Sequence, residues 1–290
     1  MAKNNSPLRY PGGKAVLTKF LADVIRLNGV QDGVYVEPFA GGAGAALNLL
    51  FTENISKIII NDADPCIFAF WKSILSQHKR FVQLIQNTEI NIDEWYRQRA
   101  IYLSPQQHSL IKVGFATFYL NRCNRSGILR NGGPIGGFDQ TGNWKIDARF
   151  NKPELISRIN TIHDYRERIE VFNMDAIDFL KEKIVSSPEA SHMLVYLDPP
   201  YYAKGGKLYM NHYIHDDHAA LAKFINRKHL FKWIMSYDNV PHINEIYDAN
   251  YRIEFSLNYS AHKTKLGSEL IIYGDDLSIP HDLSNLSIAG

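Results

Sequence analysis

Short runs of apolar residues recur along the chain and end in acidic or turn-forming residues. Five of them have the length of buried strands: VYVEPF (34–39), KIIINDADP (57–65), IEVFNMDA (169–176), HMLVYLDPP (192–200) and KWIMSYD (232–238). Helical patterns separate most of these runs, at 44–51, 177–184 and 217–225. Near-continuous apolar strands that alternate with helices are typical of a parallel sheet buried on both faces. The pattern therefore predicts an α/β fold.

Two further apolar segments lie near the end of the chain. Residues 251–260 and 268–274 follow one another without a helical pattern between them. They predict an antiparallel pair at one edge of the sheet. The complete expectation is a doubly wound, mostly parallel seven-stranded sheet.

The alternation of strands and helices breaks between the second and third strands. Residues 72–149 are helical, aromatic and polar in pattern, and they close with a passage rich in Gly, Asn and Arg at 121–143. A crossover between parallel strands needs far fewer residues. We predict that 72–149 form an inserted, largely helical lobe, whereas 1–71 and 150–290 form the main domain.

Composition restricts the class of protein. The chain has 290 residues, 45% of them hydrophobic, and a formal net charge of only +2, so any basic surface for nucleic acid must be local. The first residues lack an apolar signal segment, and no stretch reaches the 18 apolar residues of a membrane span. Cys66 and Cys123 fit no paired metal spacing and predict reduced, buried thiols. We expect a soluble cytoplasmic protein.

A glycine-rich turn follows the first strand. In YVEPFAGGAGAAL (35–47) the glycines allow the backbone to approach a ligand at a helix N-terminus, although a tight turn without a ligand fits as well. Asp62 ends the next strand, where a carboxylate suits a ribose diol or caps a helix. Together they indicate a nucleoside-containing cofactor. RYPGGK (9–14) is no phosphate-binding P-loop, because its first glycine and its Ser/Thr are missing. Lys14 is either a ligand of a cofactor carboxylate or a surface lysine.

DPPY (198–201) is the most specific motif of the chain. Proline cannot donate to a sheet ladder, so the fourth strand must stop at Asp198 and continue into a stiff turn. The Asp198 carboxylate and the Pro199 carbonyl offer two acceptors for the two protons of an exocyclic amine, and Tyr201 offers a ring for stacking. The alternative is a proline-stiffened loop without chemistry.

The histidines of HYIHDDH (212–218) lie three residues apart beside two aspartates, as metal ligands often do. DDHAALAKF, however, has the pattern of a helix N-terminus, and the amine chemistry needs no metal. We expect no metal site here.

These motifs, in their order, resemble an S-adenosylmethionine-dependent N6-adenine DNA methyltransferase of the Dam type (D12 class). The likeness rests on RYPGGK, EPFAGGAG, NDAD, the NR…SG…R passage (121–130), DPPYY and SELIIYG, and it spans essentially the whole chain. It implies transfer of a methyl group to the N6 amine of an adenine flipped out of double-stranded DNA. It also implies action as a monomer, and it leaves open whether a cognate restriction enzyme accompanies the protein in a restriction-modification system.

The resemblance assigns residues to roles. The residues expected to hold S-adenosylmethionine are Tyr10, Lys14, Glu37, Phe39, Ala40, Gly41, Asp62, Asp175 and Asp198. The catalytic residues expected around the target base are Asp198, Pro199, Pro200 and Tyr201. The residues expected to contact DNA are Asn121, Arg122, Arg125 and Arg130.

The predicted lobe carries a local basic region. Five Lys or Arg residues stand against two acidic residues between 119 and 149: Arg122, Arg125, Arg130, Lys145 and Arg149 against Asp139 and Asp147. A solvated glycine-rich hairpin is the alternative. NRCNRSGILR keeps the spacing of GATC-reading members, but Arg125 replaces their aromatic wedge and GPIGGFDQTGNWKIDARF replaces their Asn-Val-Pro-Phe-Gly run. The likeness therefore does not extend to GATC as the recognition sequence. Two rival functions are methylation of RNA adenine and a catalytically silent DNA-binding module.

Overall fold

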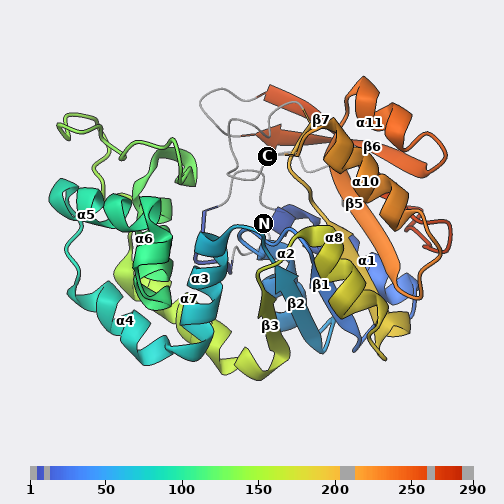
Figure 1. Cartoon of the computed structure of the whole chain (residues 1–290), viewed down its shortest axis with the longest axis horizontal. Helices are drawn as coiled ribbons and strands as arrows, with labels where there is room; N and C mark the ends of the chain where they lie inside the picture. Colours follow the sequence, from blue (N-terminus) through green and yellow to red (C-terminus); the bar gives the residue numbers. More distant parts are fainter. Residues whose placement is uncertain (1–4, 10–13, 203–212, 260–264, 283–290) are drawn as a thin grey trace.

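The computed structural model describes residues 5–9, 14–202, 213–259 and 265–282 (Figure 1). Its seven-stranded sheet has the order β3-β2-β1-β4-β5-β7-β6. The strands are β1 (Val34–Glu37), β2 (Lys57–Asn61), β3 (Ile169–Phe172), β4 (Met193–Leu197), β5 (Lys232–Asp238), β6 (Tyr251–Tyr259) and β7 (Lys265–Tyr273). The first five pair in parallel, with Val36 opposite both Ile59 and Val195. The predicted doubly wound, mostly parallel sheet is confirmed.

The last two strands form the predicted antiparallel pair. Strand β7 pairs antiparallel with β6 on one side and with β5 on the other. Only β7 therefore runs against the other six strands, and β6 lies at the edge. Because β7 lies between β5 and β6, its residues lie beside the end of β5, with Glu269 opposite Asp238.

Alternate residues of each strand enter two separate hydrophobic cores. Tyr35, Ile58 and Leu194 belong to one core, and Val36, Ile59 and Val195 belong to the other. Side chains of a strand point alternately to its two faces, so both faces of this sheet are buried. This explains why the strands read as continuous apolar runs in the sequence.

Helices cover both faces of the sheet (Figure 1). One core takes in α1 (Thr18–Leu27), α2 (Gly44–Phe51) and α3 (Pro65–Ser76), and the other takes in α8 (Ala176–Phe179) with its π-helical extension η5 (Leu180–Val185), α10 (His215–Ile225) and α11 (Pro241–Ile246). Among the described residues, no helix has the length and apolar character needed to cross a membrane.

The segment predicted as an inserted lobe is largely helical. It holds α4 (His78–Asn87), α5 (Ile92–Leu103) and α6 (Leu110–Cys123), and α7 (Lys152–Asp164) leads back to β3 (Figure 1). Phe81, Phe118 and Phe150 belong to the same core as Phe20 of α1, so packing is continuous between lobe and sheet. The division at 72 and 149 stays a prediction. Cys66 and Cys123 are free, buried thiols of this shared core, as expected.

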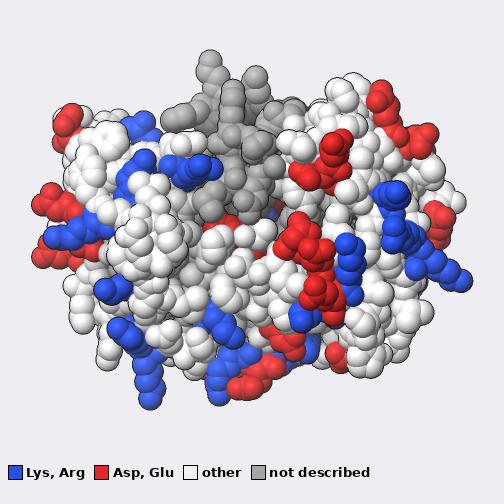
Figure 2. Space-filling model, in the orientation of Figure 1, with Lys and Arg blue, Asp and Glu red and all other residues white. Residues whose placement is uncertain are grey.

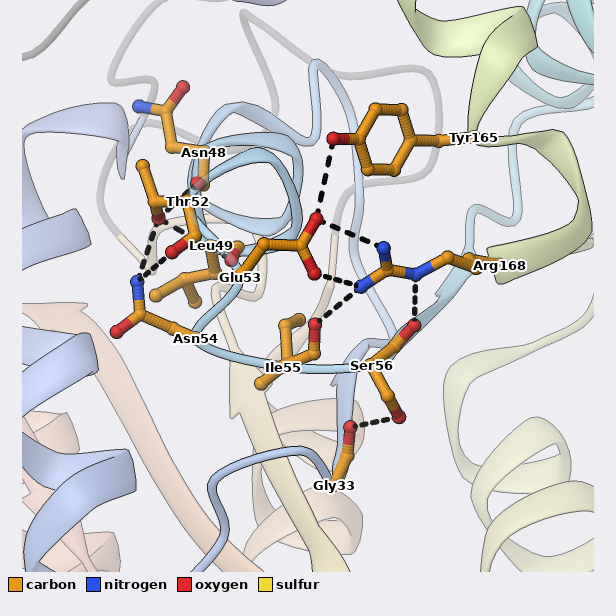
Figure 3. Close-up of polar contacts among 10 residues, drawn as sticks. All are labelled: Gly33, Asn48, Leu49, Thr52, Glu53, Asn54, Ile55, Ser56, Tyr165 and Arg168. Carbon is orange, nitrogen blue, oxygen red and sulfur yellow. Dashed lines mark hydrogen bonds and ion pairs between the residues drawn. The ribbon is translucent and has the colours of Figure 1, made fainter.

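A cluster of polar contacts joins the start of β3 to the turn between α2 and β2 (Figure 3). The Arg168 guanidinium binds both carboxylate oxygens of Glu53, at 3.0 and 2.8 Å, and also donates to the backbone oxygens of Ile55 and Ser56. This pairing lowers the pKa of Glu53. Exposed ion pairs contribute little stability each, but this bidentate pair fixes the amino ends of two neighbouring strands.

Candidate active site

A cavity of about 470 Å³ opens at the carboxyl ends of the parallel strands. This is the size of a small-molecule site, at the edge where α/β sheets bind ligands. Eight of the nine residues expected to hold the cofactor line it: Lys14, Glu37, Phe39, Ala40, Gly41, Asp62, Asp175 and Asp198. The ninth, Tyr10, lies outside the described residues.

The glycine-rich turn after β1 forms one wall of the cavity. Gly41 has a φ of 47°, a left-handed conformation that glycine adopts without strain. The turn is held from two sides, because the indole of Trp71 donates to the Gly41 carbonyl at 2.9 Å and the Gly41 N–H donates to Asp62 Oδ2 at 2.9 Å. Helix α2 then starts at Gly44.

Asp62 supports the glycine-rich turn through a hydrogen bond and does not cap a helix. Its Oδ1 accepts a hydrogen bond of 2.9 Å from the N–H of Asp64, and Asp64 is the residue that caps α3. Burial, and then the nearby Asp64 carboxylate, raise the pKa of Asp62 to about 7. The capping alternative is therefore excluded. The carboxylate faces the cavity, where a hydroxyl group of a ligand would be a suitable donor.

Asn61 is a structural residue of the site that no motif in the sequence marks. Its side-chain nitrogen donates to the carbonyls of Pro38 and Met174, both at 3.0 Å, and its oxygen accepts from the Met174 N–H at 3.0 Å. The side chain is fully buried at the end of β2. It thereby fixes the turns that carry the Gly41 and Asp175 segments relative to one another.

Glu37 is a buried carboxyl group at the end of β1. Its Oε1 accepts a hydrogen bond of 3.2 Å from the N–H of Ala46, in the first turn of α2. Burial is the main reason that the pKa of Glu37 rises to about 8, and repulsion from Asp198 adds to it. The group is therefore largely protonated at neutral pH in the free protein.

Two aromatic rings and a helix cap complete this side of the cavity. The ring of Phe39 meets that of Tyr213 edge to face, with centroids 5.6 Å apart, and both line the cavity. Asp175 caps α8 by accepting from the N–H groups of Ile177 and Asp178. Tyr213 and Tyr102, which also lines the cavity, were not predicted. No motif marks them.

The DPPY turn starts directly after β4, which ends at Leu197. Asp198 Oδ1 accepts a hydrogen bond of 2.8 Å from Ser236 Oγ and lies 3.4 Å from the Lys14 ammonium. Burial is the main reason that the pKa of Asp198 rises to about 6, while Lys14 lowers it and Glu269 raises it. Pro200 lines the cavity beside Asp198, and Pro199 is buried behind it. The catalytic role of this turn stays a prediction.

Tyr201 and Lys14 belong to a buried polar network with Glu269 of β7. The Lys14 ammonium donates to the Tyr201 hydroxyl at 2.8 Å and to Glu269 Oε2 at 3.0 Å, and the Tyr201 hydroxyl donates to Glu269 Oε1 at 2.5 Å. Lys14 is 5% exposed, so the surface-lysine alternative is excluded. Glu269 was not predicted, although one acidic residue inside the apolar strand SELIIYG signals a buried carboxylate that needs a partner.

The structure divides the four residues expected to contact DNA into two pairs. Asn121 is buried and bonds to both backbone groups of Arg9 and to the Gly127 carbonyl. Arg122 donates to the carbonyls of Arg149 and Pro7. These two side chains join the lobe to the N-terminal segment, and a DNA contact by either stays a prediction. Arg125 and Arg130 are exposed, and Arg130 lines the cavity.

The loop after Arg130 is held by Gln140. Its side-chain nitrogen donates to the carbonyls of Ile135 and Gly137, and its oxygen accepts from the N–H of Ile146 at 2.8 Å. The loop is therefore shaped by its own polar contacts, and it exposes Trp144, whose side chain is 73% accessible. Figure 2 shows both basic and acidic side chains on the lobe side of the molecule, and acidic side chains over α8 and α10.

The histidine-rich segment has a structural part within the described residues. His218 is buried, and its Nδ1 lies 2.9 Å from the Tyr237 hydroxyl, while His215 begins α10 as the sequence pattern indicated. His212 lies outside the described residues. Where the chain is described, no group of three or more His, Cys, Asp or Glu is arranged to hold a metal ion.

Comparison with solved structures finds distant similarity to the following two proteins. One is a proposed RNA methyltransferase from Pyrococcus horikoshii, with 12% identity, a TM-score of 0.42, and coverage of 92% of this chain and 85% of that chain. Another is a conserved hypothetical protein from Streptococcus pyogenes, with 12% identity, a TM-score of 0.32, and coverage of 86% and 91%. The comparison with curated proteins found no match.

The family comparison is decisive. A model of the D12 class N6 adenine-specific DNA methyltransferases matches residues 10–265, which include the glycine-rich turn, Asp62, the NR…SG…R passage and DPPY but not SELIIYG (268–274). The chain belongs to the D12 class N6 adenine-specific DNA methyltransferase family, and its reaction is site-specific methylation of adenine N6 in DNA.

Proposed function

We propose that the chain takes the methyl group from S-adenosylmethionine bound in the cavity, and that the target adenine is flipped out of duplex DNA against Asp198. One observation carries this proposal: a single cavity joins the glycine-rich turn, Asp62, Asp175 and the DPPY turn. A cofactor and a base must both reach the strand ends for methyl transfer, and proximity of the two reactants supplies much of the rate.

The residues of the cavity suit S-adenosylmethionine chemically. Asp62 and Asp175 present carboxylate oxygens to a nucleoside, and Phe39 and Tyr213 present aromatic surface. S-adenosylmethionine supplies an activated methyl group on a positively charged sulfur. The negative charge of Asp198 favours a cation near it. Lys14 binding to a cofactor carboxylate stays a prediction, because in this structure its ammonium pairs with Glu269 and Tyr201.

Asp198 is suited to hold and deprotonate an amine. Its carboxylate would accept one N–H of the adenine amine, and the Pro199 carbonyl would accept the other. This orients the nitrogen lone pair towards the methyl group. Transfer would form the N–C bond as the bond between the sulfur and the methyl group breaks, so that a neutral thioether leaves and the nitrogen carries a positive charge until it loses a proton. A carboxylate whose pKa is about 6 can take that proton and pass it to water.

The lobe is proposed to bind the DNA around the target. Arg130 lies on the cavity wall and could read a base edge, whereas Arg125, Lys145 and Arg149 are exposed for phosphate contacts. The exposed ring of Trp144 offers a stacking surface for a base. Extrusion of a base costs a few kcal/mol, which contacts in the pocket and with the lobe offset.

Methyl incorporation tests the proposal. Purified protein is given labelled S-adenosylmethionine with duplex DNA, single-stranded DNA or RNA of matched sequence, and nucleosides are analysed by mass spectrometry. N6-methyladenine in duplex DNA is the expected product. Faster methylation of RNA would favour the rival RNA enzyme. DNA binding without any incorporation would favour a silent binding module.

A further inference from the structure

The Lys14 ammonium lies between two carboxylates from distant parts of the chain. It is 3.0 Å from Glu269 Oε2 on β7 and 3.4 Å from Asp198 Oδ1 after β4. The Tyr201 hydroxyl bridges Lys14 and Glu269. Glu269 is 1% exposed, and these contacts satisfy a charge that would otherwise be costly to bury.

We propose that Glu269 is a positioning residue for methyl transfer, which acts on the reacting amine through Lys14 and Tyr201 without touching it. The proposal rests on the function proposed above. Strand β7 is suited to this role because it pairs with β5 directly beside the DPPY turn. The family resemblance assigned no role to this residue.

Glu269 would keep the Asp198 carboxylate available for the amine. Lys14 is shared between the two carboxylates, and its ammonium lies closer to Glu269 Oε2, at 3.0 Å, than to Asp198 Oδ1, at 3.4 Å. Without the Glu269 charge, Lys14 would move closer to Asp198 and occupy an oxygen that the amine needs. The Tyr201 hydroxyl would donate to a neutral oxygen in place of a carboxylate, and this weaker hydrogen bond would hold its ring less firmly beside the base.

The charge of Asp198 depends on groups from five segments of the chain. Lys14 precedes α1, Glu37 ends β1, Tyr196 belongs to β4, Ser236 to β5 and Glu269 to β7. Glu269 repels the ionised form of Asp198, whereas Lys14 and Ser236 stabilise it. Removing the charge of Glu269 and removing that of Lys14 should therefore shift the titration of Asp198 in opposite directions.

Four variants separate the effect of the Glu269 charge from the effect of its position. Glu269→Gln removes the charge and keeps the size, and Glu269→Asp keeps the charge but shortens the reach to Lys14 and Tyr201. Lys14→Met removes the shared cation. Glu254→Gln is the matched control, because Glu254 is an exposed glutamate on the adjacent strand β6. Thermal unfolding establishes that each variant is folded, and Glu269→Asp keeps the test usable if Glu269→Gln is not.

The first readout uses the free protein and needs neither cofactor nor DNA. The Asp198 carboxyl carbon is followed by NMR in protein labelled at aspartate, with Asp198→Asn used to assign the resonance. The Asp198 midpoint should move to lower pH in Glu269→Gln and to higher pH in Lys14→Met, and it should stay in place in Glu269→Asp and Glu254→Gln. An unchanged midpoint in Glu269→Gln overturns the proposal.

The second readout is single-turnover methylation of DNA. The rate constant should fall about 10- to 100-fold in both Glu269 variants, the effect of losing a charge-assisted hydrogen bond, with KM for DNA little changed. A wild-type rate in Glu269→Asp overturns the positioning role. A wild-type protein that methylates no DNA contradicts the proposed function instead, and the NMR titration still decides whether Glu269 controls the charge of Asp198.

Discussion

The hydroxyl of Ser236 donates a hydrogen bond of 2.8 Å to Oδ1 of Asp198 and thereby joins strand β5 to the turn after β4. Ser236 is itself 2.7 Å from the Tyr196 hydroxyl, and both side chains are buried. The proposed amine acceptor is thus oriented by a neighbouring strand as well as by its own stiff turn. Buried groups with fixed partners of this kind are typical of preorganised sites.

Ser236→Ala should slow methyl transfer about tenfold, because it removes one hydrogen bond to a charged acceptor. The same bond lowers the pKa of Asp198, so its loss should move the acid limb of the rate profile to higher pH. Single-turnover rates measured across pH test both effects, with the exposed Ser76→Ala as control. An unchanged rate and profile would show that Ser236 only fills space.

Asp198→Ala should abolish nearly all methylation, while Asp198→Asn should keep measurable activity because its amide oxygen still accepts one amine proton. In the wild type, activity should rise as pH increases through about 6, since the active form of Asp198 is ionised. That limb should be absent in Asp198→Asn. DNA affinity should change little in either variant. Near wild-type methylation by Asp198→Ala would show that the Asp198 carboxylate is not needed to hold the amine.

Glu37 should make the free protein less stable at alkaline pH. Its pKa is raised to about 8 in the fold, so the folded state binds a proton more tightly than the unfolded chain. The corresponding stability is fully present below about pH 4.5 and is lost as pH rises through about 8.

Glu37→Gln should make the free energy of unfolding less dependent on pH. At pH 9 it should raise that free energy by on the order of 2 kcal/mol. The amide can still accept from the Ala46 N–H. Urea unfolding of both proteins at several pH values gives the slopes. If the free energy of unfolding changes with pH equally in the wild type and in Glu37→Gln, Glu37 is ionised in the folded protein.

The sheet could be predicted from the sequence because its strands are buried on both faces. VYVE and KIIIN had to be continuous apolar runs for this reason, and the helix at 44–51 was predicted with its observed bounds. The order of the last strands could not be predicted. Nothing in the local pattern of 265–273 shows that β7 inserts between β5 and β6.

The cavity residues could be predicted where they directly follow strands. Asp62 and Asp198 follow apolar runs, and parallel strands bring such positions to one edge. Glu269, Tyr102 and Tyr213 could not be found in this way, since their place depends on contacts with distant segments. Asn121 lies in the passage predicted to contact DNA, and its position along the chain gave no sign of the contacts that its side chain makes inside the protein.

Asp62→Ala should weaken binding of S-adenosylmethionine by about 1.5–3 kcal/mol, the range for a charge-assisted hydrogen bond. The variant also removes the acceptor of the Gly41 N–H, so the turn loses support. Asp62→Asn keeps an acceptor and should lose less. Calorimetric titration of both variants, with the exposed Asp178→Ala as control, measures the difference. Equal affinity in Asp62→Ala and the wild type would leave Asp62 a purely structural role.

Arg130 and Arg149 should differ in what they contribute to DNA recognition. Both are exposed on the lobe side, but only Arg130 lines the cavity that is proposed to receive the base. A guanidinium near the bases can form paired hydrogen bonds to one guanine edge, whereas one at the periphery meets phosphates. Arg130→Ala should therefore relax discrimination at a single position of the recognition sequence, by about 1–3 kcal/mol.

Arg149→Ala should weaken binding to all sequences. It should also reduce the slope of log affinity against log salt concentration by about one. Sequencing of N6-methyladenine in a host genome after expression of each variant gives the base preferences, and binding titrations at several salt concentrations give the slopes. A methylation profile of Arg130→Ala that equals the wild type at every position would assign base reading to another residue. The same profile accompanied by a reduced salt slope would identify Arg130 as a phosphate contact, because only a base-reading arginine changes preference at one position while a phosphate contact changes affinity for all.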